Sequence, residues 1–337
     1  MASLPKRIAT LGSHTALQIL KGAKDEGFET IVVCEKGKSR AYISYGVADE
    51  IIEIERYADF FSVEDKLIER DAIIIPHGSF VAYVGAEKMP QVRVPHYGTR
   101  GILRLESNRN SQREWLAQAG LKVPKIFAHP EEIDCPVIVK THGAAGGRGY
   151  FLARTPEEFK KKIAQRDGSI EYVIQEYIIG VPVYAHYFYS RLTGELEIMG
   201  FDKRYESNAD SIGRVAAADQ ITVDLETSYT IVGNIPLVVR ESLLPEFFEI
   251  GDSVVAQSQK LEPPGLFGPF CLEGVVTSDL HFYVFEISAR IVAGTNPYIQ
   301  GSPYTALKYQ EPMSTGRRIA RDIKMAIERN ELDKVLG

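Results

Sequence analysis

The chain has 337 residues, and 39 lysines and arginines against 45 aspartates and glutamates give it a formal net charge of −6. This length predicts two or three domains, and an acidic chain without a basic tail is not typical of a nucleic-acid-binding protein. No apolar run approaches a signal-peptide core or the ~18–20 residues that span a membrane, so we expect a cytoplasmic protein without a membrane partner. The three cysteines have no paired spacing, which argues against a disulfide framework or a zinc site.

The first third of the chain alternates short apolar strands with helical patterns. Strands are expected at residues 7–11, 30–34, 51–54 and 72–75, and a helix at 15–25. This alternation predicts parallel strands joined by right-handed crossovers. Because parallel sheets bind ligands beyond the carboxyl ends of their strands, the loops after the first and fourth strands are candidate ligand sites.

After about residue 100 the strands come in pairs, which indicates antiparallel sheet. The expected pairs are 136–140 with 150–153, 183–191 with 195–204, and 270–276 with 281–287. Helices are expected at 109–119 and from Ser314 onward, where Arg317 and Arg318 should lie on a solvated face. The segment 233–236, Gly-Asn-Ile-Pro, is expected to form a turn.

A glycine-rich loop follows the strand that ends at Lys140. Residues 141–149 read Thr-His-Gly-Ala-Ala-Gly-Gly-Arg-Gly, and this composition suits a nest of backbone N–H groups around a phosphate. The spacing fits neither a P-loop nor a dinucleotide fingerprint. We therefore expect a flap with Lys140 at its base, Gly146 and Gly147 in its backbone and Arg148 at its tip; the alternative is an ordinary surface turn.

Two glutamates interrupt the last pair of apolar strands. A hairpin turn between Asp279 and Leu280 would place Glu273 and Glu286 opposite each other. Like charges in that position are destabilising, and a divalent cation would relieve them, since Mg²⁺ takes one or two protein carboxylates together with phosphates and water. The alternatives are that both side chains face solvent, or that Arg290 neutralises one of them.

The two strand ends of the N-terminal sheet carry polar residues. Ser13 and His14 lie between the first strand and its helix, where helix N–H groups can receive an anion. His77 and Ser79 follow the fourth strand and should converge on the same crevice. Helix caps are the simpler alternative for both. A further segment, 175–180, is expected to be a connector whose backbone contacts an adenine.

Lys140, the glycine-rich loop, segment 175–180 and the Glu273–Glu286 pair together resemble the ATP-grasp enzymes. Within that superfamily the chain is similar to the archaeal formate-dependent 5-formaminoimidazole-4-carboxamide ribonucleotide (FAICAR) synthetases, the PurP family. The similarity spans essentially the whole chain. Its most specific segments are 13–22 (SHTALQILKG), 78–82 (GSFVA), 204–208 (RYESN), 233–236 (GNIP) and 285–296 (FEISARIVAGTN).

The resemblance implies a fold and a reaction. The fold would be an N-terminal parallel α/β domain (1–100) for the substrate nucleotide, followed by a two-part ATP-grasp body with largely antiparallel sheets: a small subdomain (101–180) and a large one (181–337). The reaction would be formylation of 5-aminoimidazole-4-carboxamide ribonucleotide (AICAR) by formate and ATP in purine biosynthesis. It would proceed through formyl phosphate and release ADP and phosphate.

The resemblance also assigns roles to residues. Lys140 and Arg148 would be catalytic, and Glu273 and Glu286 would hold Mg²⁺ or Mn²⁺. The nucleotide contacts would be His14, Ser79 and Asn234, and the ATP contacts would be Lys140, Gly146, Gly147, Gln175, Glu176, Tyr177 and Glu206. Three positions depart from expectation: Ser288 stands where many ATP-grasp enzymes have asparagine, Val181 follows Gly180 where they often have glutamate, and His77 stands where a smaller residue is expected.

Two other functions remain open at this point. One is an ATP-grasp ligase that joins a different carboxylate, such as an amino acid, to an amine. The other is a nucleotide-binding regulator without catalysis, although such a protein has little need for two facing carboxylates. We also expect a homo-oligomer, with AICAR, formate and ATP as its small-molecule partners.

Overall fold

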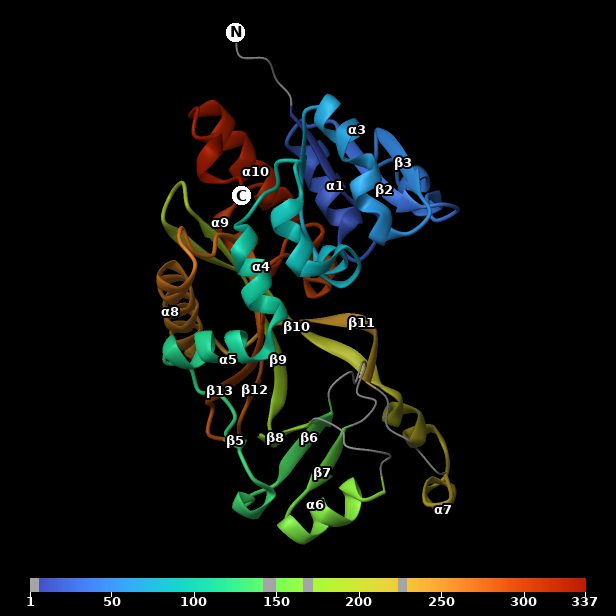
Figure 1. Ribbon diagram of the computed structural model, residues 1–337, viewed down its shortest axis with the longest axis vertical. Helices are drawn as coiled ribbons and strands as arrows, with labels where there is room; N and C mark the ends of the chain where they lie inside the picture. The colour runs from blue at the N-terminus through green and yellow to red at the C-terminus, as the bar shows by residue number, and fades with distance from the viewer. Residues whose placement is uncertain (1–5, 142–149, 166–171, 224–228) are drawn as a thin grey trace.

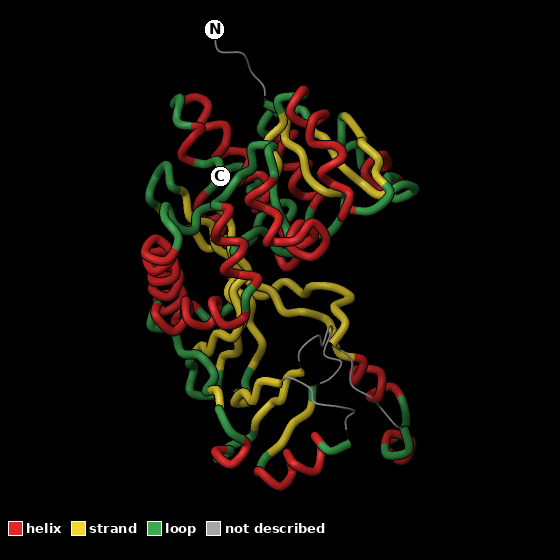
Figure 2. Tube along the Cα trace, in the orientation of Figure 1, coloured by secondary structure: helices red, strands yellow, loops and turns green. Residues whose placement is uncertain are grey.

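The computed structural model describes residues 6–141, 150–165, 172–223 and 229–337. Three sheets follow one another along the long axis of the molecule (Figure 1). The parallel sheet lies at the top of this view, the largest sheet in the middle and the smallest at the bottom; Figure 2 shows helices covering the first two on their outer sides.

The N-terminal sheet is parallel throughout, in the order β3-β2-β1-β4. Its strands are β1 (Arg7–Leu11), β2 (Thr30–Glu35), β3 (Glu50–Ile54) and β4 (Ala72–Ile74). The helices between them are α1 (Ala16–Asp25), α2 (Arg40–Ser44) and α3 (Glu64–Glu69). Gly27, with φ of 91°, ends the turn after α1 in a conformation that favours glycine. The parallel sheet confirms the prediction for this third of the chain.

The largest sheet has the strand order β11-β10-β9-β12-β13 and is antiparallel. Its strands are β9 (Val181–Ser190), β10 (Glu195–Ser207), β11 (Tyr229–Leu237), β12 (Gly268–Val276) and β13 (Phe282–Ser288). Both expected hairpins, β9–β10 and β12–β13, are present. Inward-facing aromatic side chains such as Tyr187 and Phe270, whose rings stack 4.8 Å apart, fill the core beneath the sheet.

The expected turn at 233–236 is wrong, because these residues lie inside β11, where Asn234 pairs with Arg204 and Pro236 with Asp202. Proline has no N–H to donate to a neighbouring strand. It is tolerated here because β11 is an edge strand, which needs hydrogen bonds on one side only.

The smallest sheet has the order β5-β8-β6-β7 and is also antiparallel. Its strands are β5 (Ile126–Phe127), β6 (Val137–Thr141), β7 (Phe151–Ala153) and β8 (Tyr172–Glu176), and α6 (Pro156–Ile163) covers it. The expected pairing of the strands on either side of the glycine-rich loop is confirmed, since Val139 pairs with Phe151. Lys140 therefore lies at the end of β6 that leads into the loop.

Six further α-helices complete the described part of the fold. They are α4 (Arg100–Ser107), α5 (Arg109–Gln118), α7 (Ala217–Gln220), α8 (Leu244–Leu261), α9 (Pro303–Lys308) and α10 (Thr315–Glu328). The indole of Trp115 on α5 donates to the carbonyl of Val254 on α8, so α5 packs with the largest sheet. None of the helices in these described stretches is long and apolar enough to cross a membrane.

The C-terminal helix α10 packs on α1 of the N-terminal sheet. A Cβ added at Gly22 would lie 2.2 Å from the Arg317 nitrogen, so glycine permits this close approach. The Ser314 hydroxyl accepts from the Arg317 N–H, as expected for an N-cap. The solvated face expected for Arg318 is wrong: its side chain is buried and pairs with Glu197 and Asp322. The domain limits at 100 and 180 remain a prediction.

Candidate active site

Two cavities lie on the largest sheet. The first, which we call the sheet cavity, has a volume of about 240 Å³ and lies against the strands. The second, the inter-sheet cavity, has about 330 Å³ and lies between the smallest sheet, α4, α5 and β13. Glu286 and Arg290 line both, so the two cavities share a wall.

The two glutamates face each other, as predicted. Glu273 and Glu286 occupy paired positions on β12 and β13. Glu273 is 1% exposed; its Oε1 pairs with the Arg204 guanidinium and accepts from the Ser288 hydroxyl at 3.2 Å. Glu286 is accessible from the cavities, yet the protein around it still desolvates its carboxylate. This desolvation, followed by the charge of Glu273, raises the pKa of Glu286 to about 7.

The arrangement fits a divalent cation. The second oxygen of Glu273, Oε2, is buried without a hydrogen-bond partner among the described residues, and such an atom is costly unless something else binds it. No group of three His, Cys, Asp or Glu side chains able to hold a metal is found in the described ranges. A cation here would therefore take two carboxylates and complete its shell with phosphate oxygens and water, as Mg²⁺ does. The metal role of both residues remains a prediction.

Lys140 lines the inter-sheet cavity together with Gln175 and Glu286. Its ammonium donates to the Gln175 side-chain oxygen at 3.1 Å. Burial lowers the pKa of Lys140, and the charge of Glu286 acts in the opposite direction. A cation in this position can bind the phosphates of a nucleotide. Arg148, Gly146 and Gly147 lie outside the described residues, so their roles stay predictions.

Glu176 and Tyr177 were expected to contact an adenine through their backbone, but their N–H groups are already used within the protein. The N–H groups of Glu176 and Tyr177 already donate to Lys125 and Pro136, both at 2.8 Å. These residues can therefore contact an adenine only through a carbonyl or a side chain. Glu206, near the end of β10, is half-buried, and burial raises the pKa of its carboxyl.

The two polar strand ends of the N-terminal sheet meet, as predicted. The hydroxyls of Ser13 and Ser79 are hydrogen-bonded, and the rings of His14 and His77 stack at 5.3 Å with 2° between their planes. His77 lies 3.0 Å from the Leu11 carbonyl through Nε2 and accepts the Ser79 N–H through Nδ1 at 3.2 Å. These two bonds fix a neutral His77 whose Nε2 carries the proton.

Desolvation by the surrounding protein favours the uncharged form of both imidazoles, although His14 is exposed at the surface. It lowers the pKa of the fully buried His77 to about 4, and it lowers the pKa of His14, with His77 and Arg290 adding to the effect. His14 also has a positive φ of 56° and lines the sheet cavity. The histidine at position 77 thus lies under His14 and away from the ligand space, which explains how the larger residue is accommodated.

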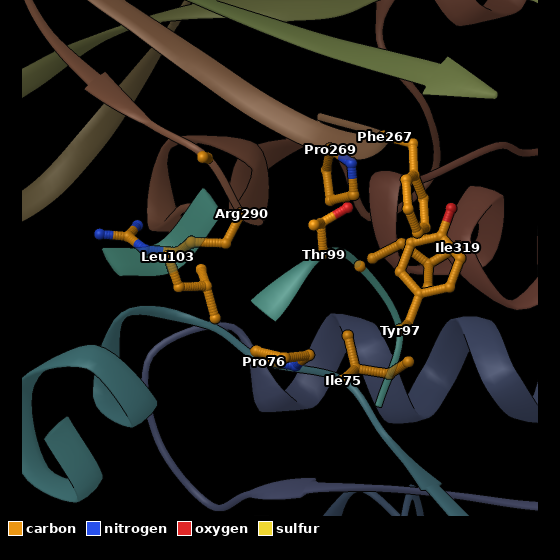
Figure 3. A pocket seen from close by; sticks show the side chains of 11 residues that line it. Ile75, Pro76, Tyr97, Thr99, Leu103, Phe267, Pro269, Arg290 and Ile319 are labelled. Atoms are coloured by element: carbon orange, nitrogen blue, oxygen red, sulfur yellow. The ribbon is translucent and has the colours of Figure 1, made fainter. Parts of the chain in front are cut away.

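Arg290 also belongs to the site. From the sequence it was expected only as a possible neutraliser of one of the two glutamates. It instead pairs with Glu106 at 3.0 Å, and Glu106 also accepts the Ala289 N–H at 2.9 Å. The Nε of Arg290 is buried without a partner in the described part of the chain. Figure 3 shows Arg290 at one end of a third pocket, opposite Tyr97. That pocket holds only about 20 Å³, too little for a substrate.

Asn234 lies on β11 and lines the sheet cavity. Its amide nitrogen donates to Asp202 on β10 at 2.7 Å. Arg204, between Glu273 and the Tyr184 ring, and the buried Asp202 were not given a role from the sequence. Both lie in or beside the segment 204–208 that carries the family resemblance, but only the paired strands bring them to the cavity.

Comparison with known proteins gives the family. Residues 151–337 match a family model described as a domain of unknown function (DUF1297), and residues 8–127 match one described as a protein of unknown function (DUF1246). A Pyrococcus abyssi protein named 5-formaminoimidazole-4-carboxamide-1-(beta)-D-ribofuranosyl 5'-monophosphate synthetase is 53% identical, over 100% of both chains. The chain belongs to this synthetase family. Relatives of the same name from Pyrococcus horikoshii and Methanocaldococcus jannaschii are 55% and 47% identical, covering 98% of this chain and 99% and 94% of theirs.

Solved structures agree with this family. The IMP biosynthesis protein PurP from Thermococcus kodakaraensis has a TM-score of 0.78 at 31% identity and covers 98% of this chain and 100% of its own. An ADP complex of N5-carboxyaminoimidazole ribonucleotide synthetase has a TM-score of 0.67 at 15% identity, with 95% of this chain and 77% of that chain covered. At that identity only the fold is shared. The synthetase therefore has the ATP-grasp fold, as predicted.

Proposed function

We propose that this synthetase is an ATP-dependent ligase that formylates the exocyclic amine of AICAR with formate, giving FAICAR, ADP and phosphate in purine (IMP) biosynthesis. One observation supports the proposal most strongly: Glu286 and Arg290 border both cavities. A phosphate donor in the inter-sheet cavity and a nucleotide in the sheet cavity would therefore meet at the same two side chains.

In the first step a formate oxygen attacks the γ-phosphorus of ATP. An O–P bond forms, the bond to the β-phosphate oxygen breaks, and ADP leaves. In the second step the amine nitrogen attacks the carbon of formyl phosphate; a C–N bond forms, the C–O bond to phosphate breaks, and the nitrogen loses a proton. Both steps depend chiefly on positioning and on stabilising negative charge.

The chain's own residues divide between the two substrates. Lys140 would hold the ATP phosphates, and Gln175, which accepts a hydrogen bond from its ammonium, would orient it. His14, Ser79 and Asn234 would hold the nucleotide: His14 and Asn234 line the sheet cavity, whereas Ser79 does not line it and is hydrogen-bonded to Ser13 at the meeting of strand ends, where an anion is favoured. The lowered pKa of His14 favours a neutral imidazole, which would act as a hydrogen-bonding group rather than as a counter-charge.

Glu273 and Glu286 would hold Mg²⁺ or Mn²⁺, which would neutralise charge on the transferred phosphoryl group. Arg148, Gly146 and Gly147 would close over the ATP phosphates, while Glu176, Tyr177 and Glu206 would contact its nucleoside. The cytoplasmic location and the homo-oligomer expected from the sequence complete the proposal.

Product identification tests the reaction. The protein is incubated with AICAR, ¹³C-formate, ATP and Mg²⁺, and the nucleotides are separated and analysed by mass spectrometry. We expect AICAR to be converted to a nucleotide that carries one labelled formyl group, together with an equal amount of ADP. ADP formation without a labelled nucleotide would contradict the proposal.

A further inference from the structure

Three polar side chains on neighbouring strands form a chain of hydrogen bonds at the wall of the sheet cavity. His186 on β9, Asp202 on β10 and Asn234 on β11 all line this cavity. Asp202 is in the middle: its Oδ1 lies 2.8 Å from His186 Nε2, and its Oδ2 lies 2.7 Å from Asn234 Nδ2. His186 and Asp202 are each 1% exposed, whereas Asn234 is only half-buried.

The chemistry of the aspartate determines how the asparagine is turned. A carboxylate accepts hydrogen bonds and donates none, so the group that Asn234 presents to Asp202 must be its NH₂. The carbonyl oxygen of the same amide then lies on the other side. Among the described residues none donates a hydrogen bond to that oxygen, and Asn234 borders the cavity. Asn234 therefore offers the cavity an acceptor.

The surroundings hold this arrangement in place. His186 donates to the other oxygen of Asp202, so neither carboxylate oxygen is left free to turn. A Cβ added at Gly294 would lie 2.3 Å from Asp202 Oδ1 and 2.6 Å from the His186 ring, so the backbone packs directly on the pair. This close packing limits how far the pair can move, and a buried carboxylate with both oxygens hydrogen-bonded keeps a fixed orientation.

We propose that Asp202, held by His186, is a positioning residue that fixes Asn234 as a hydrogen-bond acceptor, and that this makes the cavity selective for a nucleotide whose base carries a carboxamide N–H. The proposal rests on the proposed function and deepens it. AICAR has two N–H groups, the reacting amine and the carboxamide. The amine loses its proton when it attacks the formyl carbon, so the carboxamide is the N–H group that can keep a hydrogen bond to Asn234 throughout the reaction, and Asn234 borders the cavity.

A site that leaves a buried acceptor unpaired rejects a ligand that lacks the donor. The probe is the AICAR analogue in which the carboxamide is replaced by a methyl ester. This group is neutral and similar in size, but has no N–H. Binding of AICAR and of the ester to the wild-type protein is measured by calorimetry without formate, and we expect the ester to bind about 10- to 100-fold more weakly.

The variant that tests the positioning role is Asp202→Asn. An asparagine there can donate to the Asn234 carbonyl, which lets Asn234 turn its NH₂ toward the cavity. We expect the preference for AICAR over the ester to fall below about threefold, while ATP binding and the melting temperature stay near those of Asp252→Asn, a control at an exposed position of α8. If Asp202→Asn does not fold, Asn234→Leu, which removes the acceptor, must abolish the same preference.

Equal binding of AICAR and the ester by the wild-type protein would overturn the proposal, as would an undiminished preference in a folded Asp202→Asn protein. A general loss of packing lowers both affinities together and leaves their ratio unchanged, so the ratio reports the orientation of Asn234. The proposed function is tested separately: a wild-type protein that formylates AICAR but does not discriminate against the ester retains its function and refutes only the positioning role.

Discussion

Glu273 and Glu286 occupy directly paired positions on β12 and β13, and both carboxylates border the sheet cavity. Such a pair of like charges is destabilising in a sheet, and Arg204 and Ser288 compensate only one oxygen of Glu273. The other oxygen has no described partner. The two carboxylates therefore repel each other in the folded sheet, and a bound cation would relieve this repulsion. A cation at this position is what an enzyme of phosphate chemistry requires.

Replacing Glu286 by glutamine should abolish ATP turnover, with a fall of at least about 100-fold, because one of two metal carboxylates is lost. AICAR binding should change by less than about twofold, since a neutral amide keeps the shape of the side chain. Turnover and AICAR affinity are measured together with those of Glu249→Gln, an exposed control on α8. Undiminished turnover in Glu286→Gln would refute the metal assignment.

Lys140→Met should raise the KM for ATP and lower kcat by about 100-fold, because the side chain keeps its length and loses the charge that faces the phosphates. AICAR affinity should be unaffected. The control is Lys161→Met on the exposed side of α6. A kinetic effect confined to the KM for AICAR would contradict this prediction, because it would indicate that Lys140 contacts AICAR and not ATP.

The Glu106–Arg290 pair predicts a particular pattern of stabilities. Glu106→Leu alone leaves a partly buried guanidinium without its carboxylate and should lower the free energy of unfolding by up to about 3 kcal/mol. Adding Arg290→Met should restore much of that loss, because two apolar groups replace two charges. Urea unfolding measures both values. The double variant should remain inactive, since Arg290 borders both cavities, and recovery of activity would contradict this role.

Much of the fold follows from local sequence pattern. The strands of the parallel sheet and the hairpins of the large sheet are bounded by glycine, proline and polar residues, and their apolar periods can be counted. The pairing of Glu273 with Glu286 is predictable for the same reason, since it needs only the position of one turn. Gly233 and Pro236 led to the wrong prediction of a turn, because glycine and proline occur both in turns and on edge strands. Only the tertiary structure shows that β11 is an edge strand.

The partners of the buried charged residues cannot be predicted from local sequence pattern. Arg318 follows the helical period of a surface residue, but Glu197 on β10 and Asp322 on the same helix make its burial favourable. Arg290 and Asp202 likewise depend on partners far away in sequence, Glu106 and Asn234. Which charges are paired inside the protein is set by contacts between segments that no periodicity reveals.

Acid should destabilise the protein through its buried histidines. Burial, aided by Arg100, lowers the pKa of His96 to about 3, so His96 stays neutral in the folded state while it becomes protonated in the unfolded state. Stability from this group is present above the unfolded pKa and is lost as the pH falls below it, by about 2 kcal/mol at pH 5.

The variant His96→Leu should therefore lose less stability between pH 8 and pH 5 than the wild-type protein does. The measurement is the free energy of unfolding at both pH values. Val94→Ala, another buried substitution nearby, serves as the control: it should destabilise the protein equally at both pH values. An unchanged pH dependence in His96→Leu would show that His96 does not titrate as described.

The central claim is that the two cavities serve one reaction in which formate accepts the phosphoryl group of ATP. It is tested most directly by the rate of ADP release with ATP, Mg²⁺ and AICAR, measured with and without formate. We predict ADP release that requires formate and matches FAICAR formation mole for mole. ADP release at the same rate without formate, or none with all four present, would contradict the claim.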